Sequence, residues 1–384
     1  MDGPQAGGPA GQATAIRLLN RLERSLPSHY YWAPAVYEQE KERLFYRKWL
    51  CAGREEELAR PGEFVLRQVA DESVLLVRDN EGAIRGFYNV CRHRGARLAT
   101  EAEGCFPRHG ITCPYHGWTY ALDGRLQGTP HMVRMPDFAK PDYPLHPIQV
   151  TVWEGFVFLS LAAEPIPLQE QMEGLWTHFA RYRLQALRRA TRVVYDVAAN
   201  WKLLIENFTE CFHCPHIHPE LDRVTPYLAG GAAEREGARA WRGGHWMELA
   251  EGCHTLTVTG EKHRPNLSGI SPEDRSRVYY NTLYPNFFLS LHPDYVLTHT
   301  LWPAGPERTR LVCEWLFEPE TMATGDFDPR DTVEFWDLVN RQDFRVCELA
   351  HQGNRSRAHP HGVHVAQESG PQHFTRYIQA ELRD

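Results

Sequence analysis

The chain has 384 residues, of which 42% are hydrophobic and 24% charged, and its net charge is −7. This composition is typical of a globular protein and gives no basic stripe for nucleic-acid binding. The sequence contains no apolar run of about 18 residues, so no membrane-spanning helix is expected, and the N-terminus lacks a secretory signal pattern. We therefore expect a cytoplasmic protein with reduced thiols. The odd count of 9 cysteines beside 20 histidines favours metal ligands over a disulfide framework.

The first predicted element is a helix over residues 35–49, where apolar residues recur at helical spacing. From Cys51 to Ser160 the pattern changes to short β-rich runs separated by turn residues. The predicted strands cover residues 64–66, 73–77, 84–90 and 148–159. Together they predict an all-β unit of about 110 residues, an ordinary size for a domain.

Pro165 and Pro167 mark a boundary, after which more helix is predicted. The expected elements are a mostly helical stretch over 168–189, a strand over 193–198, a helix over 201–212, strands over 287–291, 295–302 and 311–317, and a long helix over 332–352. Asp331 is the expected N-cap of the last helix and Gly353 its expected stop. The whole chain is therefore expected to have an α+β fold.

Two short segments of the all-β unit each combine a cysteine with a histidine. Cys91-x-His93 and Cys113-x-x-His116 offer two thiolates and two imidazoles. A structural zinc site is one interpretation, although zinc fingers keep their cysteines together and their histidines together on a helix. One cysteine and one histidine in each loop suit better a two-iron cluster with two Cys on one iron and two His on the other.

A second group of metal-ligand residues lies between Asn200 and Glu220. Glu210 and His213 would share a helix face, and Pro215 would break the helix so that His218 returns to the same point. Two histidines and one carboxylate, with open positions opposite, are the ligand set of non-haem Fe(II) oxygenases. His216 lies between the candidate ligands but has the wrong helical phase. Cys211 and Cys214 would offer thiolates, which are softer ligands than oxygen chemistry usually employs, so we expect none of the three to be a ligand.

The third ligand has to come from a distant segment, and helix phase offers Asp343. The nearby positions on the same face of the predicted last helix are apolar: Trp336, Val339, Val346, Cys347 and Ala350. A bare carboxylate in such a stripe would cost several kcal/mol, so it should bind a metal or be paired. Helix phase alone leaves open a buried salt bridge to Arg345 or Lys202.

Both groups resemble motifs of one family. Cys91-x-His93 with the run CPYHGWTY (113–120) resembles the Rieske domain of ring-hydroxylating and related oxygenases. The segment NWKLLIENFTECFHCPHIHPE (200–220) resembles the iron motif of these Rieske non-haem iron oxygenases, and NRQDF (340–344) resembles their third-ligand element. The resemblance covers nearly the whole chain.

This resemblance implies a set of site residues. The ligands of a [2Fe–2S] cluster would be Cys91, His93, Cys113 and His116, and those of a mononuclear Fe(2+) would be His213, His218 and Asp343. Trp118 is expected to pack beside the cluster. Glu210 takes the position of an acidic bridge between the iron of one subunit and a cluster histidine of its neighbour, although Asp is the commonest residue there.

The resemblance also implies an architecture and an activity. An all-β Rieske domain is expected over residues 45–162. A catalytic domain over 163–384, joined by residues 1–44, would wrap an antiparallel sheet around the long C-terminal helix (helix-grip type). The implied protein is a homotrimeric terminal oxygenase that uses O₂ and electrons from a separate NAD(P)H-dependent reductase of the flavin/ferredoxin type. An electron carrier with an appended binding domain is the alternative class, but it would not need the second iron site.

The substrate is less constrained by the sequence. Segments 200–221 and 342–348 are more similar to the betaine, choline and carnitine oxygenase branch than to the naphthalene-type branch. This favours monooxygenation and N-dealkylation of a quaternary ammonium compound, with hydroxylation or O-demethylation of an aromatic compound as the alternative. The predicted strands after Tyr279 are rich in aromatic residues, which could box a quaternary ammonium by cation–π attraction, although most aromatic side chains build core. Strand alternation places Phe288, Ser290 and His292 on one face.

Overall fold

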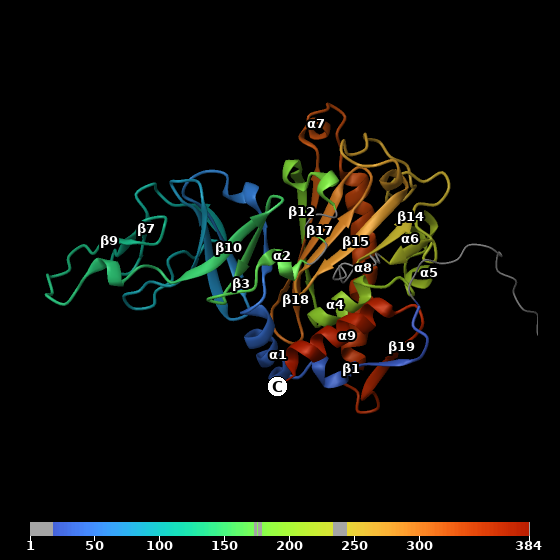
Figure 1. The fold of residues 1–384 in the computed structure, drawn as a ribbon, viewed down its shortest axis with the longest axis horizontal. Coiled ribbons are helices and arrows are strands. Elements are labelled where there is room, and N and C mark those ends of the chain that lie inside the picture. Colours follow the sequence, from blue (N-terminus) through green and yellow to red (C-terminus); the bar gives the residue numbers. More distant parts are fainter. Residues whose placement is uncertain (1–17, 173–174, 176–178, 233–243, 384) are drawn as a thin grey trace, which may run out of the picture.

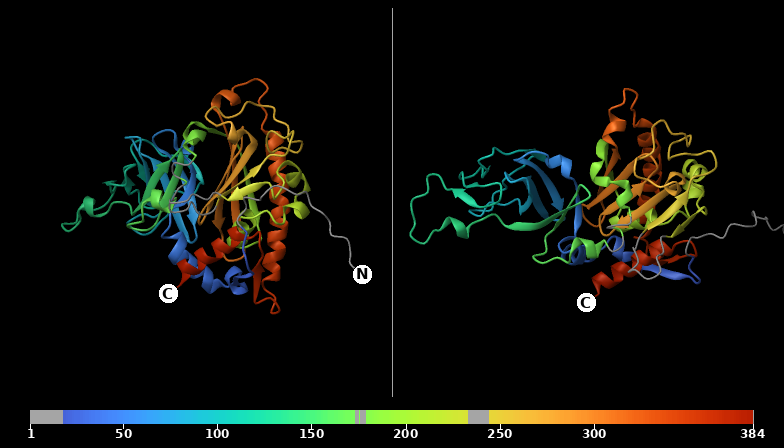
Figure 2. Two further views of the ribbon diagram at one scale, coloured as in Figure 1. Left: turned by 45° about the vertical axis from the view of Figure 1, so that its right-hand side comes forward. Right: turned by 45° about the horizontal axis from the view of Figure 1, so that its top comes forward.

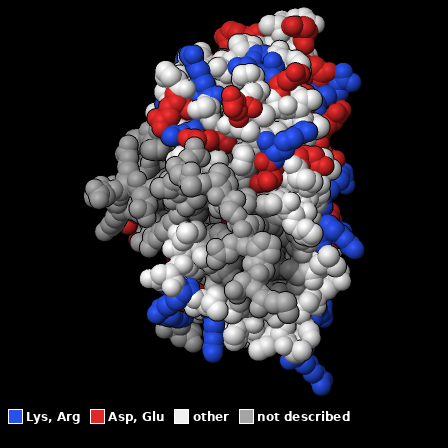
Figure 3. Space-filling model, turned by 90° about the vertical axis from the view of Figure 1, so that its right-hand side faces the viewer, with Lys and Arg blue, Asp and Glu red and all other residues white. Residues whose placement is uncertain are grey.

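The computed structural model describes residues 18–172, 175, 179–232 and 244–383 (Figure 1). Two seven-stranded antiparallel sheets lie next to each other, and the helices gather around the second one. Within the described residues, no helix is both long and apolar enough to cross a membrane. Acidic and basic side chains are interspersed over the upper part of the face shown in Figure 3.

The first sheet has the strand order β2-β11-β10-β5-β4-β3-β6. Its strands are β2 Leu50–Arg54, β3 Glu63–Val69, β4 Glu72–Arg78, β5 Ile84–Tyr88, β6 Glu103–Cys105, β10 Pro147–Trp153 and β11 Phe156–Ser160. The predicted strands over 64–66, 73–77 and 84–90 correspond to β3, β4 and β5. The stretch 148–159 is a hairpin rather than one strand, because Glu154 and Gly155 take positive φ angles of 48° and 77° and turn β10 into β11.

A small three-stranded sheet extends from the first one, at the left of Figure 1. It consists of β7 Ile111–Thr112, β8 Thr119–Tyr120 and β9 Leu126–Gly128. The second Cys–His loop connects β7 to β8, so this sheet fixes the position of Cys113 and His116.

The second sheet has the order β12-β18-β17-β16-β15-β14-β13. Its strands are β12 Arg188–Val197, β13 Gly230–Ala232, β14 Gly244–Glu248, β15 Arg277–Leu283, β16 Phe287–Leu291, β17 Val296–Pro303 and β18 Thr309–Phe317. The predicted strands over 287–291, 295–302 and 311–317 correspond to β16, β17 and β18. The prediction of a mostly helical 168–189 is wrong for its described part: α2 (Leu168–Gln171) is followed by short 3₁₀ turns, and β12 already begins at Arg188, where it pairs with β18.

The long helix α8 (Arg330–Gly353) packs on one face of the second sheet, as Figures 1 and 2 show. Trp336 and Val339 of α8 share a core with Tyr280, Phe288 and Trp315 of the sheet. The opposite face carries Phe287, Leu289 and Leu316, which pack against Trp49 and Phe158 from the region of the first sheet. The expected antiparallel sheet around a long helix is therefore confirmed.

The start of α8 differs slightly from the prediction. Pro329 occupies the N-cap, and Asp331 lies inside the first turn, where its carboxylate pairs with Arg264. Gly353 is the last residue of the helix, as predicted.

Segments from both ends of the chain complete the region below the second sheet (Figure 1). The strand β1 (Glu23–Pro27) pairs with β19 (His361–His364), and α9 (Ser369–Leu382) packs on β1 and on α4 (Trp201–Phe208). The predicted N-terminal helix is α1 (Pro34–Glu40), continued by one π-helical segment, Lys41–Phe45. The other α-helices with bounds inside the described residues are α5 Cys214–Ile217, α6 Pro219–Val224 and α7 Pro319–Met322.

Candidate metal centres

The two Cys–His loops are built alike. The backbone N–H of Gly95 donates to the carbonyl of Cys91 at 3.0 Å, and that of Gly117 donates to the carbonyl of Cys113 at 3.1 Å. Both glycines have positive φ, 71° and 73°, a region that other residues enter only at a cost. Each loop thus folds back four residues after its cysteine, and its histidine lies within the turn.

The four side chains pair by type. Cys91 and Cys113 are buried, and the pKa of the Cys113 thiol is raised by burial and by the neighbouring Cys91. His93 and His116 are exposed, with ring centroids 4.6 Å apart. Thiol beside thiol and imidazole beside imidazole is the arrangement that a cluster with Cys₂ on one iron and His₂ on the other needs. One zinc ion would instead need all four donors at a single point.

Two aromatic residues support the cluster loops. The ring of Trp118 stacks on His93 with 4.9 Å between centroids, which agrees with the expectation that this tryptophan packs beside the cluster. The hydroxyl of Tyr120 accepts a hydrogen bond from the backbone N–H of Arg92 at 3.1 Å and lies 3.2 Å from Sγ of Cys91. Because its oxygen already accepts from Arg92, its proton is available to the sulfur.

We expect Tyr120→Phe to lower the reduction potential of the cluster. A hydrogen bond to a ligand sulfur stabilises the more negative, reduced cluster, and its loss removes that stabilisation. If the bond differs by about 1 kcal/mol between the two oxidation states, the potential falls by about 40 mV. Protein-film voltammetry measures this shift, and an unchanged or raised potential would contradict the assigned hydrogen bond.

A second group converges from distant parts of the chain. The ligand atoms of His213, His218 and Asp343 all lie within 4.8 Å of one another. Oδ1 of Asp343 is 3.2 Å from Nε2 of His213 and 2.7 Å from Nε2 of His218. Two imidazoles and one carboxylate aimed at one point match the facial set that binds Fe(II).

The local fold explains how the two histidines meet. The helix α4 ends at Phe208, four residues earlier than the predicted helix end, and the hydroxyl of Thr209 bonds to the carbonyl of Ile205. The short helix α5 begins directly after His213, with Pro215 in its first turn, and His218 follows its last residue. Pro215 therefore starts a helix, where its missing N–H is harmless, instead of ending one.

Both histidines direct Nε2 toward Asp343 because Nδ1 is engaged elsewhere. Nδ1 of His213 donates to Oε1 of Glu210 at 2.5 Å, and Nδ1 of His218 donates to Oε1 of Gln342 at 2.7 Å. A hydrogen bond from Nδ1–H fixes the tautomer whose Nε2 lone pair is free for a metal. The prediction that Glu210 and His213 lie together holds, although a turn rather than a helix face brings them together.

The surroundings of Asp343 exclude the salt bridge to Lys202. Lys202 is fully buried and pairs with Glu40 of α1, while Arg345 is exposed. Burial favours the neutral form of the Asp343 carboxyl, but His213 and His218 hold its pKa well below the usual range. The carboxylate is therefore ionised and available as a ligand.

Iron loading should depend on pH through His213. Burial disfavours a charged ring, but the carboxylates of Asp343 and Glu210 raise the pKa of His213 to about 10. A metal binds the ring without this proton, so binding has to release it. We expect the affinity of the apoprotein for Fe²⁺ to rise about tenfold per pH unit around neutrality, as measured by equilibrium dialysis. A constant affinity for Fe²⁺ between about pH 6 and 8 would contradict this coupling to the proton of His213.

A disulfide joins Cys211 to Cys214 on either side of His213. This corrects the expectation that the thiols are all reduced, because the turn places the two sulfurs next to each other; the other seven cysteines are free. It agrees with the expectation that neither cysteine is a ligand. His216 is exposed and lies outside the group of three ligands.

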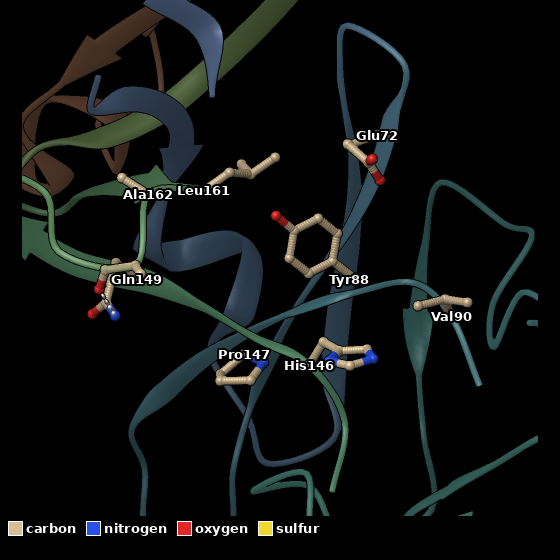
Figure 4. A pocket seen from close by; sticks show the side chains of 9 residues that line it. Glu72, Tyr88, Val90, His146, Pro147, Gln149, Leu161 and Ala162 are labelled. Atoms are coloured by element: carbon tan, nitrogen blue, oxygen red, sulfur yellow. Dashed lines mark hydrogen bonds between the residues drawn. The ribbon is translucent and has the colours of Figure 1, made fainter. Parts of the chain in front are cut away.

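A separate pocket of about 640 Å³ lies on the first sheet (Figure 4). Tyr88 and Glu72 line it from neighbouring strands, and the hydroxyl of Tyr88 points toward the side where Leu161 lies. Its lining contains none of the metal-ligand residues, so it is distinct from both centres.

Comparison with known proteins identifies the family. A Rieske [2Fe-2S] domain model matches residues 48–139, and a model of the ring hydroxylating alpha subunit catalytic domain matches residues 184–384. The chain belongs to the Rieske ring-hydroxylating oxygenase family. The first match contains the two Cys–His loops, and the second contains His213, His218 and Asp343.

Several relatives of this oxygenase are quaternary ammonium monooxygenases. The glycine betaine monooxygenase oxygenase subunit of Pseudomonas aeruginosa is 33% identical, over 92% of this chain and 88% of the relative. The carnitine monooxygenase oxygenase subunit of Escherichia coli is 34% identical over 87% and 85%. The crystal structure of the quaternary ammonium Rieske monooxygenase CntA with L-carnitine has a TM-score of 0.77 at 22% identity, covering 94% of this chain and 96% of that one. Naphthalene 1,2-dioxygenase from Rhodococcus sp. has a TM-score of 0.74 at 18% identity, over 93% and 94%.

These matches confirm the predicted chemistry and cofactors. The chain is an oxidoreductase with a Rieske [2Fe–2S] domain and a catalytic domain of the class that binds mononuclear iron. As an oxygenase subunit it works with a separate reductase and a small-molecule substrate. The structural neighbours at this low identity support the fold alone.

Proposed function

We propose that this oxygenase monooxygenates a small quaternary ammonium compound of the betaine type at a carbon next to the nitrogen. O₂, two electrons and two protons convert a C–H bond into a C–OH bond and release water. The hydroxylated carbon then loses the nitrogen, giving an aldehyde, a tertiary amine and a proton. The relatives named above support this substrate class.

The proposal assigns Cys91, His93, Cys113 and His116 to the cluster and His213, His218 and Asp343 to the mononuclear iron. The residues fit these groups: the thiols and imidazoles pair by type, and the facial group has its tautomers fixed for metal binding. When bound, the cluster would supply single electrons and the iron would activate O₂. The task of the protein is to orient the substrate and exclude water.

The observation that supports a quaternary ammonium substrate is a set of aromatic rings beside His213, His218 and Asp343. Phe208 stacks on Phe288 with 4.0 Å between centroids and makes an edge contact with Tyr280 at 5.9 Å. Phe208 directly follows Asn207, whose side-chain amide lies 3.3 Å from Nε2 of His213, so these rings lie near the candidate iron ligands. Ring faces close to the metal can hold a quaternary ammonium by cation–π attraction, which is stronger when the site is desolvated.

Glu210 has a positioning role in this proposal. It accepts a hydrogen bond from His213, and its side chain is about one-tenth exposed. We propose a homotrimer in which Glu210 contacts a cluster histidine of the neighbouring subunit; the exposure of His93 and His116 leaves both accessible for this contact.

The domain division also belongs to the proposal. We assign residues 45–162 to the Rieske domain and 163–384 to the catalytic domain, with 1–44 joining the latter. The pairing of β1 with β19 supports the placement of the N-terminal segment. Residues 1–17 lie outside the described part, and the cytoplasmic location stays a prediction.

An oxygen-uptake screen with a generic flavin/ferredoxin reductase tests the substrate class. Glycine betaine, carnitine and choline are compared with simple aromatic acids and methoxybenzoates. We expect uptake coupled to aldehyde formation with at least one quaternary ammonium compound. Coupled uptake with an aromatic compound alone would overturn the proposal in favour of ring hydroxylation or O-demethylation.

A further inference from the structure

Three polar side chains on the helix-facing side of the second sheet are buried without a hydrogen-bond partner. They are Tyr280 on β15, Ser290 on β16 and His292 just after β16, and we call them the polar group. The hydroxyl of Tyr280, the Oγ of Ser290 and both ring nitrogens of His292 are unpartnered within the described residues. Tyr280 is paired directly with Ser290 across the strands, so the three lie next to one another.

Some polar atoms around the polar group have partners, whereas Nδ1 of His299 and the indole N–H of Trp315, on the same face of the sheet, also have none among the described residues. The indole N–H of Trp336 donates to the hydroxyl of Tyr295 at 2.8 Å, and that hydroxyl donates to the carbonyl of Leu256 at 3.1 Å. The ring of His292 stacks on Tyr295 at 4.0 Å and meets Trp336 at 5.7 Å. Its ring is therefore held in place by packing and lies beside the backbone of Tyr295. Buried polar atoms in a native protein are expected to have a partner, so either ordered water or a ligand has to complete the polar group.

The polar group lies at one end of a path that begins at the iron ligands. Trp336 and Asp343 are on the same face of α8, seven residues apart, which is about 10 Å along a helix. Tyr280 contacts Phe208 and Trp336 with ring centroids 5.9 and 6.4 Å apart. Tyr280 therefore belongs both to the aromatic rings near the iron ligands and to the polar group.

We propose that Tyr280, Ser290 and His292 bind the carboxylate of the substrate, so that the enzyme selects zwitterionic betaines over purely cationic quaternary ammonium compounds. This inference rests on the proposed function and specifies its substrate further. Two hydroxyls and one ring N–H provide three donors, and a carboxylate is an acceptor that can use all of them.

The neutrality of these donors explains why a zwitterion fits. Burial, together with the nearby His299, lowers the pKa of His292, so its ring is neutral. A lone anion would be costly to bury among neutral groups. A betaine brings its own positive charge, which the aromatic rings hold, and its carboxylate then needs hydrogen bonds rather than an arginine or lysine. Choline lacks the carboxylate and would leave the three donors unpaired, a mismatch that binding sites discriminate against strongly.

Steady-state oxygen uptake by the reductase-coupled holoenzyme tests this assignment with glycine betaine and choline as the two probes. We expect kcat/KM for glycine betaine to exceed that for choline by about 100-fold. Tyr280→Phe and Ser290→Ala should each reduce this ratio about tenfold by raising KM for glycine betaine, with little change in kcat/KM for choline. His292→Phe keeps the stacked ring and should act in the same direction.

Tyr284→Phe is the matched control, because it removes another buried, unpartnered tyrosine hydroxyl from the same strand region. Tyr284 packs on Phe374 and Tyr377 of α9, away from the polar group, so the ratio should stay at the wild-type value. Cluster absorption and iron content report whether each variant is folded.

Two results would overturn the assignment, and they are distinguishable. Equal losses for glycine betaine and choline in the polar-group variants, in an enzyme active on betaine, would assign these side chains a structural role and leave the proposed function standing. If the wild-type enzyme consumes neither compound nor any other betaine, the proposed function fails and the carboxylate assignment fails with it.

Discussion

Replacing Asp343 with Ala is expected to abolish substrate oxidation while the [2Fe–2S] absorption remains that of the wild type. The carboxylate is the only anionic member of the compact ligand group found among the described residues, and it lies within 3.2 Å of Nε2 of both histidines. Its loss removes one of three protein ligands. Replacing a residue that only hydrogen-bonds a metal ligand lowers activity by up to roughly 100-fold, and losing the ligand itself should lower activity more. The cluster loops are on other strands and should be unaffected.

The measurement is iron and acid-labile sulfide per chain, together with turnover. Asp343→Ala should lose about one iron of three and keep both sulfides. Asp337→Ala is a suitable control, because Asp337 is also on α8 but pairs with Arg341 and accepts from the hydroxyl of Tyr195. Full activity in Asp343→Ala, or a loss of sulfide, would refute the assignment of the third ligand.

The second large effect is expected for Glu210→Gln, which should block electron transfer between the two centres and leave both metals bound. Glutamine keeps the shape of the side chain, and its carbonyl can still accept from Nδ1 of His213. It removes the negative charge, however, and with it the ability to hold or pass a proton between two imidazoles. If Glu210 bridges to a neighbouring cluster histidine, oxidation of the reduced cluster by O₂ in the presence of substrate should slow by about 100-fold or more.

Glu206→Gln is the matched control for this experiment. Glu206 is one helical turn earlier in the same segment, where burial raises its pKa to about 8 and the hydroxyl of Tyr31 donates to it. Its carboxyl is therefore largely neutral at pH 7, and the amide changes little charge. Stopped-flow absorbance of the cluster follows the reaction, and equal rates in wild type and Glu210→Gln would refute the bridging role.

The two candidate ligand groups could be predicted from the sequence because their residue types and spacing are restrictive. Two loops with one cysteine and one histidine each, and a histidine pair around Pro215, leave few chemical alternatives. The apolar stripe around Asp343 indicates that this carboxylate needs a partner, but helix phase leaves the partner open, and only the fold shows that Lys202 pairs with Glu40 instead. Helix phase predicts which face of a helix a residue lies on, but it cannot predict which side chains of other elements pack against that face.

Other functional contacts have no sequence signal of their own. Gln342 fixes the tautomer of His218 only because α8 passes the turn after α5, and Tyr120 reaches Cys91 only because β8 crosses behind the first loop. The hairpin turn does have a sequence signal, because Glu154-Gly155 is a polar pair with glycine between two apolar runs, whereas no glycine or proline marks the early end of α4 at Phe208. The unpartnered state of Ser290 and His292 likewise depends on tertiary packing, although strand alternation predicts that both lie on one face together with Phe288.

The central claim is that one chain holds both the electron store and the iron that oxygenates a betaine. A single-turnover experiment tests it most directly. The purified protein is reduced at its cluster, freed of reductant, and mixed with O₂ and glycine betaine or carnitine in the absence of any reductase. We predict that the absorption of the oxidised cluster returns as aldehyde is formed, with less than one aldehyde per reduced chain. Reoxidation of the cluster without product from any quaternary ammonium compound would contradict the claim.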